Sequence, residues 1–311
     1  MSSLLVFPGQ GAQQPGMLQR LPPNPLVQAC LQEAAQVLGE DPLTLDSPAA
    51  LANTRAVQLC LLIAGVASAR LLLEQAPAPE YVAGLSIGAY PAAVVAGALE
   101  FADALRLVSL RGELMQRAYP EGYGMTAIIG LQLATVEALL AQVHSEQAPV
   151  YLANINADSQ LVIAGSDAAM LRVAELARGC GVGVAKRLAV SVPSHCPLLA
   201  QPAQALAEAF AQVPMQAPRL GYLSSSRARP LRQVEQLRDD LAFNMCRVVD
   251  WRGTVQGAYE RGVRLQIELP PGAVLTGLAR RVFEQGSVIA YDGARLDTLQ
   301  ALLHEEVRRD R

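Results

Sequence analysis

A serine between two glycines is the first group in this sequence whose surroundings suggest chemistry. Residues 84–88 are Gly-Leu-Ser-Ile-Gly, which matches the pattern G-x-S-x-G. A short apolar segment precedes the motif and a helical pattern follows it, a context that places such a serine on a sharp turn with an accessible hydroxyl. The free N–H groups at the start of the helix can stabilise a developing oxyanion. The motif also arises by chance in a chain with 24 glycines, so Ser86 needs an accompanying base.

The base must be sought among three histidines. A serine hydroxyl is a poor nucleophile until a base takes its proton, and histidine is the usual base near neutral pH. His195 lies between Pro193 and Pro197, which restrict the local backbone. His144 and His304 lie in polar helical segments, so His195 is the favoured base for Ser86. Cys196 is a rival nucleophile, but without a second histidine nearby we interpret it as a packing residue.

A single arginine in an apolar helical segment is a candidate for substrate recognition. Arg111 lies among Leu107, Val108, Leu110 and Leu114, and this pattern indicates at least partial burial. One interpretation is an ordinary salt bridge with a nearby acidic residue such as Glu113 or Asp103. The other is a guanidinium fork that binds a carboxylate of a ligand. The sequence alone does not separate the two.

Other polar residues fit both structural and functional interpretations. Residues 7–11, Phe-Pro-Gly-Gln-Gly, form either a simple turn or the source of a second oxyanion N–H group. Asn154 and Asn156 occupy alternate positions of a predicted strand and so face the same side, where they line a cleft or pair with backbone groups. Lys186 and Arg187 are interpreted as a solvated pair, with contact to a phosphate as the alternative.

The elements that must position these residues predict an α/β fold. Short apolar strands alternate with helical patterns over the first 120 residues, which is typical of a parallel sheet covered by helices. Residues 125–190 instead show the order βαββαβ of a ferredoxin-like subdomain, with its last strand over residues 182–190. The helix–strand alternation resumes after Pro193. We predict a large α/β domain over residues 1–122 and 192–311, and an inserted ferredoxin-like subdomain over residues 123–191.

Composition excludes several classes of protein. The chain has 311 residues, of which 51% are apolar and 17% charged, so it has enough apolar material for a core and is not a disordered chain. Apolar stretches such as residues 59–69 are shorter than the roughly 20 residues of a membrane span. With no export signal evident, we expect a cytoplasmic protein. The net charge of −3 argues against nucleic acid as a partner, and five scattered cysteines predict neither a metal site nor disulfides.

Taken in order along the chain, the motifs resemble those of malonyl-CoA:acyl carrier protein transacylases. The resemblance rests on residues 7–11, 84–88, Arg111 with Met115-Gln116, residues 193–196, and Pro-Gly-Ala-Val-Leu-Thr-Gly-Leu at 271–278. It covers nearly the whole chain. It implies an α/β-hydrolase-like large domain with a parallel sheet and an inserted ferredoxin-like subdomain, in agreement with the fold predicted from periodicity.

The resemblance also implies roles for individual residues. Ser86 would be the acylated nucleophile, His195 its general base and later acid, and Arg111 the group that binds the free malonyl carboxylate. The backbone N–H groups of Gln10 and Ile87 would form the oxyanion hole. In this family a backbone carbonyl orients the histidine. The matching residue here is Asn244, and because the family position is usually glutamine, we expect this change to matter little if only the carbonyl is used. The positions that match site-lining residues are Gln58, Met115, Asn154, Asn156 and Ser194.

The implied reaction transfers a malonyl group from malonyl-CoA to the thiol of an acyl carrier protein that carries a phosphopantetheine-type arm. Malonyl-CoA is a substrate, and no permanently bound cofactor is expected. The elbow differs from the usual Gly-His-Ser-Leu-Gly-Glu of the family at Leu85 and Ala89. Together with residues 122–125, it is more similar to the epsilon-type subunit of bacterial malonate decarboxylase. We therefore favour a role in malonate decarboxylase, with the transacylase of fatty acid or polyketide synthesis as the alternative.

Two other functions stay open at this point. An esterase or thioesterase could use the same elbow, but such enzymes place an acid between serine and histidine in the chain. The available Asp103, Asp158 and Asp167 lie in a helix or in the inserted subdomain. A subunit that only docks a carrier, with an inactive serine site, is the second rival. The candidates for carrier contact on the inserted subdomain are Arg172, Arg178, Lys186 and Arg187.

Overall fold

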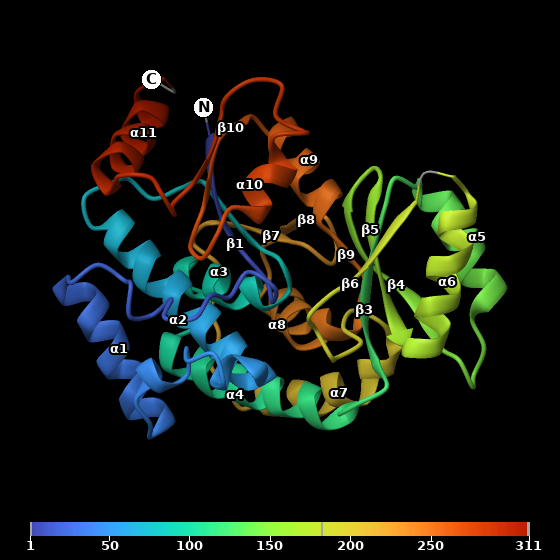
Figure 1. Ribbon diagram of the computed structural model, residues 1–311. Coiled ribbons are helices and arrows are strands. Elements are labelled where there is room, and N and C mark those ends of the chain that lie inside the picture. Colours follow the sequence, from blue (N-terminus) through green and yellow to red (C-terminus); the bar gives the residue numbers. More distant parts are fainter. Residues whose placement is uncertain (1, 182, 310–311) are drawn as a thin grey trace.

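Two sheets organise the protein (Figure 1), and the computed structural model describes residues 2–181 and 183–309. The strands of the larger sheet are β1 (Ser2–Phe7), β2 (Tyr81–Gly84), β7 (Gly221–Ser224), β8 (Arg229–Leu231), β10 (Val263–Glu268) and β11 (Ser287–Ala290). Those of the smaller sheet are β3 (Tyr123–Ile129), β4 (Val150–Ala157), β5 (Gln160–Ser166), β6 (Val184–Arg187) and β9 (Val249–Asp250). The predicted α/β fold with a parallel sheet is confirmed.

The larger sheet has the order β11-β10-β1-β2-β7-β8 and is parallel except for the edge strand β8. The side chains of the central strand β1 explain why the sheet is parallel. Leu5 and Phe7 pack into the core on one face, and Leu4 and Val6 pack into the core on the other. A strand that is apolar on both faces is stable only when helices cover the sheet on both sides, which is the environment of parallel strands.

Helices supply this cover. On one face, α2 packs against α1, α3, α4 and α11, while α9 and α10 contact β10 from the other face (Figure 1). Their bounds are α1 (Pro25–Leu38), α2 (Thr54–Leu73), α3 (Ala89–Val95), α4 (Phe101–Ala118), α7 (Ala200–Phe210), α8 (Val234–Phe243), α9 (Trp251–Glu260), α10 (Val274–Ala279) and α11 (Leu296–Arg309). α1 begins at Pro25 because Asn24 caps the first turn, and it ends at Leu38 because Gly39 adopts the left-handed conformation.

One helix, α2, is both long and strongly apolar. By length and composition, the 20 residues of α2 could cross a membrane. However, 89% of its apolar window is buried inside the fold. α2 is therefore the central core helix of the larger unit, and its hydropathy reflects contact with other helices rather than with lipid.

The smaller sheet has the order β6-β3-β5-β4-β9. Its first four strands are antiparallel, and α5 (Leu133–Val143) and α6 (Asp167–Gly179) pack on one face. This is the predicted ferredoxin-like βαββαβ arrangement. The last strand is shorter than predicted, since β6 covers Val184–Arg187, and Val182 lies outside the described residues.

Two short strands, β8 and β9, were not predicted from the sequence. β9 pairs in parallel with β4 through Asn154 and Val249, and so joins the smaller sheet from a segment far outside the predicted insertion. The limits 123–191 for the inserted subdomain stay a prediction, but the sheet built on it needs residues 249–250 as well.

Candidate active site

Ser86 lies where the chain turns sharply from β2 into a single 3-10 turn, Ser86–Gly88, and then α3. Its φ of +58° is a left-handed value that L-residues other than glycine rarely adopt. The two glycines of the motif make the turn possible. A Cβ on Gly84 would collide with the backbone of Gly88, and a Cβ on Gly88 would collide with the carbonyl of Phe7. The elbow predicted from the motif is therefore present.

His195 faces Ser86 from a loop 109 residues further along the chain. Its φ is +63°, and its backbone N–H donates to the Met245 carbonyl at 2.7 Å. The ring Nδ1 lies 2.7 Å from the Asn244 carbonyl oxygen, and Nε2 lies 2.9 Å from the Ser86 Oγ. Because a carbonyl can only accept, Nδ1 must carry the proton, and Nε2 is left to accept from the serine hydroxyl.

Burial keeps this imidazole uncharged. His195 is 3% exposed. Burial, and secondarily the positive charge of Arg111, lowers its pKa to about 4, against a smaller opposing effect of the bond to Asn244. His195 is therefore neutral at neutral pH and is able to take a proton.

Arg111 extends from α4 into the same cluster and is fully buried, with 0% exposure. Its Nη2 donates to the Ser86 Oγ at 3.3 Å and to the Asn244 Oδ1 at 3.1 Å. Among the described residues, its Nε and Nη1 have no hydrogen-bond partner. Burial lowers the pKa of Arg111, and the guanidinium lies 5.8 Å from the centre of the Tyr90 ring. A buried cation with two free donors is unsatisfied unless an anion joins it.

The structure decides against an ordinary salt bridge for Arg111. Asp103 pairs with Arg106 at 2.9 Å, and Glu113 lies 3.5 Å from Arg55. In the described part of the chain, Arg111 forms no ion pair with a carboxylate. The guanidinium is therefore available to a carboxylate that comes from outside the chain.

Asn244 contributes its side chain to the site as well as its backbone carbonyl. Besides its carbonyl, which contacts His195, its side chain accepts from Arg111 and lies with Nδ2 3.4 Å from the Ser86 carbonyl oxygen. The expectation that only the backbone of this residue matters is therefore incomplete. Tyr90 was missed as well: its hydroxyl donates to the Leu241 carbonyl at 2.9 Å, which holds the ring beneath Arg111. Its position four residues after Ser86 was the only signal for it in the sequence.

The other predicted site residues fall into two groups. Gln58 and Met115 are buried beside the cluster, where the Gln58 Nε2 donates to the Met115 Sδ at 3.3 Å. Ser194 is buried, and its hydroxyl faces the Val192 carbonyl at 3.5 Å.

The second group lines a pocket of about 440 Å³ between the larger unit and the smaller sheet. Gln10 and Leu85 line it on one side, and Asn154 and Asn156 on the other. In the described part of the chain, the Oδ1 atoms of both asparagines have no hydrogen-bond partner. The N–H groups of Gln10 and Ile87 make no turn or loop hydrogen bond within the described residues. Their assignment to the oxyanion hole stays a prediction.

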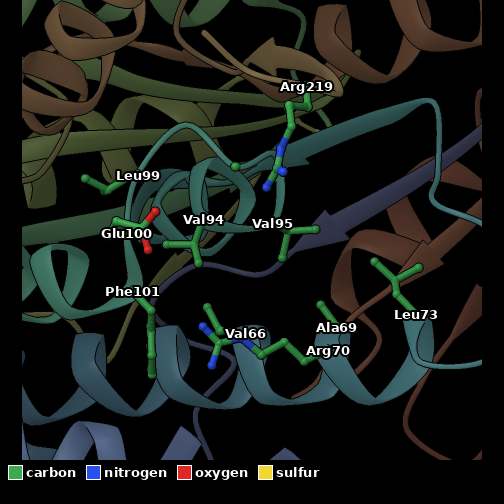
Figure 2. A pocket seen from close by; sticks show the side chains of 11 residues that line it. Val66, Ala69, Arg70, Leu73, Val94, Val95, Leu99, Glu100, Phe101 and Arg219 are labelled. Carbon is green, nitrogen blue, oxygen red and sulfur yellow. The ribbon is translucent and has the colours of Figure 1, made fainter. Parts of the chain in front are cut away.

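A second, smaller pocket of about 290 Å³ lies away from this cluster (Figure 2). Arg70, Glu100 and Arg219 are its charged residues. Arg219 precedes β7, whereas Ser86 follows β2, and the two strands are parallel, so the pocket lies at the opposite edge of the sheet. No predicted site residue lines it, and Arg70 is already paired with Glu33 at 3.3 Å.

The arrangement as a whole can form and break an ester on Ser86. It has a hydroxyl, a neutral base at hydrogen-bond distance, free N–H groups near the elbow and a buried cation. This is the set required for acyl transfer to and from an acid-bearing acyl group.

Comparison with known proteins points to the same chemistry. The model of the acyl transferase domain family matches residues 4–307. Malonyl CoA-acyl carrier protein transacylases of Haemophilus influenzae and Escherichia coli are each 39% identical over 285 residues, covering 89% and 90% of this chain and 91% and 92% of the relatives.

Solved structures agree. FabD from Acinetobacter baumannii is similar with a TM-score of 0.92 at 38% identity, over 98% of this chain and 99% of that one. A malonyl-transacylase in complex with a type II PKS acyl-carrier protein has a TM-score of 0.90 at 35% identity, over 98% of this chain and 100% of that one. The chain therefore belongs to the acyl transferase domain family, among the malonyl CoA-acyl carrier protein transacylases, and is an acyltransferase.

Proposed function

We propose that this protein transfers a malonyl group from malonyl-CoA to the thiol of an acyl carrier protein through a malonyl ester on Ser86. The observation that carries the proposal is Arg111, a buried guanidinium with two free donors, 3.3 Å from the attacking oxygen. An acyl group whose own carboxylate meets this arginine would satisfy it.

The first half-reaction forms the ester. The Ser86 Oγ attacks the thioester carbon while His195 Nε2 takes the hydroxyl proton. The carbonyl oxygen becomes an oxyanion, which the N–H groups of Gln10 and Ile87 would stabilise. Each such donor typically lowers the barrier by about 3 kcal/mol. The C–S bond then breaks, and His195 returns its proton to the sulfur of CoA.

The second half-reaction reverses these steps with another thiol. The carrier's thiol loses its proton to His195 and attacks the ester carbon. The C–O bond to Ser86 breaks, and the serine recovers the proton. The acyl group passes from a thioester to the Ser86 ester and back to a thioester by acyl exchange alone, with no oxidation or reduction, so the reaction requires neither a resident metal nor a resident cofactor.

Arg111 separates malonyl from acetyl donors. With malonyl bound, its carboxylate pairs with the guanidinium in a buried site. An acetyl group leaves the buried cation unpaired, which costs several kcal/mol. The same logic disfavours a simple esterase, because a hydrolase for uncharged acyl groups gains nothing from a buried arginine.

The remaining part of the proposal is which carrier protein accepts the malonyl group. The relatives named as transacylases, and the solved complex with a type II PKS carrier, favour a carrier of fatty acid or polyketide synthesis over that of malonate decarboxylase. The elbow residues Leu85 and Ala89 still favour the decarboxylase carrier. We take a carrier of fatty acid or polyketide synthesis as the proposal and keep the carrier of malonate decarboxylase as the second candidate. The cytoplasm remains the predicted location.

Intact-mass spectrometry tests the chemistry. The wild type and Ser86→Ala would be incubated briefly with malonyl-CoA, with acetyl-CoA or with neither. We expect a malonyl adduct on the wild type alone and a much weaker acetyl adduct. Release of free malonate without transfer to any carrier would instead establish a hydrolase. No adduct and no turnover, with carrier still bound, would establish a docking subunit.

A panel of carriers tests the pathway. The malonylated protein would be offered carriers with a phosphopantetheine arm and a malonate decarboxylase carrier with its longer, dephospho-CoA-derived arm. Faster transfer to the phosphopantetheine carriers supports the proposal. Faster transfer to the decarboxylase carrier reverses it in favour of the second candidate.

A further inference from the structure

The charges that line the pocket beside Ser86 are all positive. Among the residues that form it, the charged ones are Lys186 and Arg187, and no acidic residue of the described chain lines it. The protein as a whole has a net charge of −3, so this local balance does not follow from composition. A pocket whose only charges are cationic favours an anionic ligand.

The two cations differ in their surroundings. Arg187 lies 2.7 Å from Asp167 and donates to the Tyr123 carbonyl at 2.7 Å. Lys186 is the single lysine in the chain, and within the described residues its side chain has no ion pair or hydrogen bond. Lys186 is thus the pocket cation that is free to bind.

The register of the smaller sheet aims Lys186 at the pocket. Lys186 is opposite Ala127, which also lines the pocket, whereas the neighbouring pair Ile128 and Ala185 packs under the helices on the other face. Successive side chains of a strand point to opposite faces. The ammonium group is therefore on the pocket side, at the exposed edge strand β6.

The remaining polar groups suit a chain that contains amides. Asn154 and Asn156 line the pocket with Oδ1 atoms that lack partners in the described structure, and Asn154 is only 5% exposed. Unsatisfied buried acceptors require donors. The pantetheine arm shared by CoA and carrier proteins has two amide N–H groups between its thiol and its phosphate, which supplies donors and an anion in one ligand.

We propose that Lys186 binds the phosphate of the pantetheine arm while the thiol end of the arm lies at Ser86. This inference rests on the proposed function and adds the residue that recognises the far end of its substrates. The phosphate has two sources, the pyrophosphate of CoA and the phosphodiester of the carrier, and they share the same chemistry.

The kinetic test compares malonyl-CoA with malonyl-pantetheine, which lacks phosphate. For Lys186→Ala, the ratio of kcat/KM for the two donors should fall about tenfold, as expected for the loss of one charge-assisted contact. Lys186→Arg should restore most of the ratio, and Lys186→Glu should lower it further. The control is Arg295→Ala, an exposed cation paired with Asp297 at 2.6 Å, which does not line the pocket and should leave the ratio unchanged. An unchanged ratio in Lys186→Ala overturns the proposal.

A binding test does not depend on catalysis. Because the chain has one lysine, an amine-selective reagent modifies one side chain, and peptide mass spectrometry reads it directly. Desulfo-CoA should slow the modification of Lys186 several-fold, and desulfo-pantetheine should not. Equal rates with and without desulfo-CoA overturn the inference. If the wild type forms no malonyl-Ser86, the proposed function fails, and the protection result still decides the phosphate contact.

The two halves of the reaction separate the phosphate sources. A rise in KM for malonyl-CoA during formation of malonyl-Ser86 assigns Lys186 to the CoA pyrophosphate. A rise in KM for the holo-carrier relative to free pantetheine as acceptor assigns it to the carrier phosphodiester. Either rise in KM, or both, supports the proposal. If KM rises in neither half-reaction, the proposal is contradicted.

Discussion

The cluster around Ser86 and the pocket beside it are built on opposite principles. In the cluster, Ser86, His195, Arg111 and Asn244 are all more than nine-tenths buried and joined by direct hydrogen bonds. In the pocket, the Oδ1 atoms of Asn154 and Asn156 and the ammonium group of Lys186 have no partner within the described part of the chain. Groups that must act on a bond being made are held rigidly before substrate arrives, whereas groups that hold a long flexible arm can be more exposed.

The largest effect should come from the base. His195→Ala removes the acceptor of the serine proton, so the rate of malonyl-Ser86 formation should fall about 10⁴-fold or more. Quench-flow with detection of the adduct measures it. His144→Ala, directly after the end of α5 in the smaller unit, is the matched control. A loss of less than tenfold in His195→Ala would show that the cluster does not carry the chemistry.

The second-largest effect should be on the choice between malonyl and acetyl donors. Arg111→Ala removes the buried cation, so the ratio of malonyl to acetyl transfer should fall by about 10²–10³, the range expected for one buried charge pair. Competition between the two donors, followed by mass spectrometry, gives the ratio directly. Retained malonyl preference would mean that the pocket, rather than the cluster, selects the acyl group.

Substitutions of Asn244 test whether its side chain positions Arg111 or only supports the fold. Asn244→Asp is nearly isosteric, but its carboxylate would pair with Arg111 and compete with malonyl. We expect kcat/KM for malonyl-CoA to fall about tenfold or more, with a smaller change for acetyl-CoA. Asn244→Gln keeps an amide and serves as the control. Equal losses for both donors in Asn244→Asp would indicate a purely structural role.

The smallest effect should be that of mild acid. The pKa of His195 is lowered to about 4, so the imidazole stays neutral down to about that pH, and the catalytic form is lost only as the pH falls through it. kcat/KM at pH 5.5 should therefore remain within about twofold of its value at pH 7.5. A histidine of ordinary pKa would by then have lost most of its activity, and a tenfold fall would contradict the assigned cause.

Arg111 also affects the pH at which activity is lost in acid, which we call the acid limb of the pH profile. Its positive charge lowers the pKa of His195, so Arg111→Ala should move the acid limb to higher pH. Acetyl-CoA is the suitable donor, because this variant is expected to handle malonyl poorly. An unchanged limb would leave burial as the sole cause.

Local patterns were enough to predict the fold and the pairing of Ser86 with His195. The strand–helix alternation and the two elbow glycines act within a few residues of their own positions. Apolar neighbours predicted at least partial burial of Arg111, but its complete burial and its lack of an acidic partner could not be predicted, because they depend on how α4 packs against the elbow. The Asn244 side chain and the strand β9 were missed for the same reason: their partners lie tens of residues or more away along the chain.

The pairing of β9 with β4 has a consequence for anyone who exchanges parts between relatives. Two residues that follow Asn244 by only a few positions close the outer edge of the smaller sheet. A transplanted segment 123–191 would arrive with that edge bare, and an uncovered edge strand recruits other chains. Grafts meant to alter carrier choice should therefore include residues 249–250. The smaller sheet is complete only with these residues, although they lie outside the continuous segment 123–191.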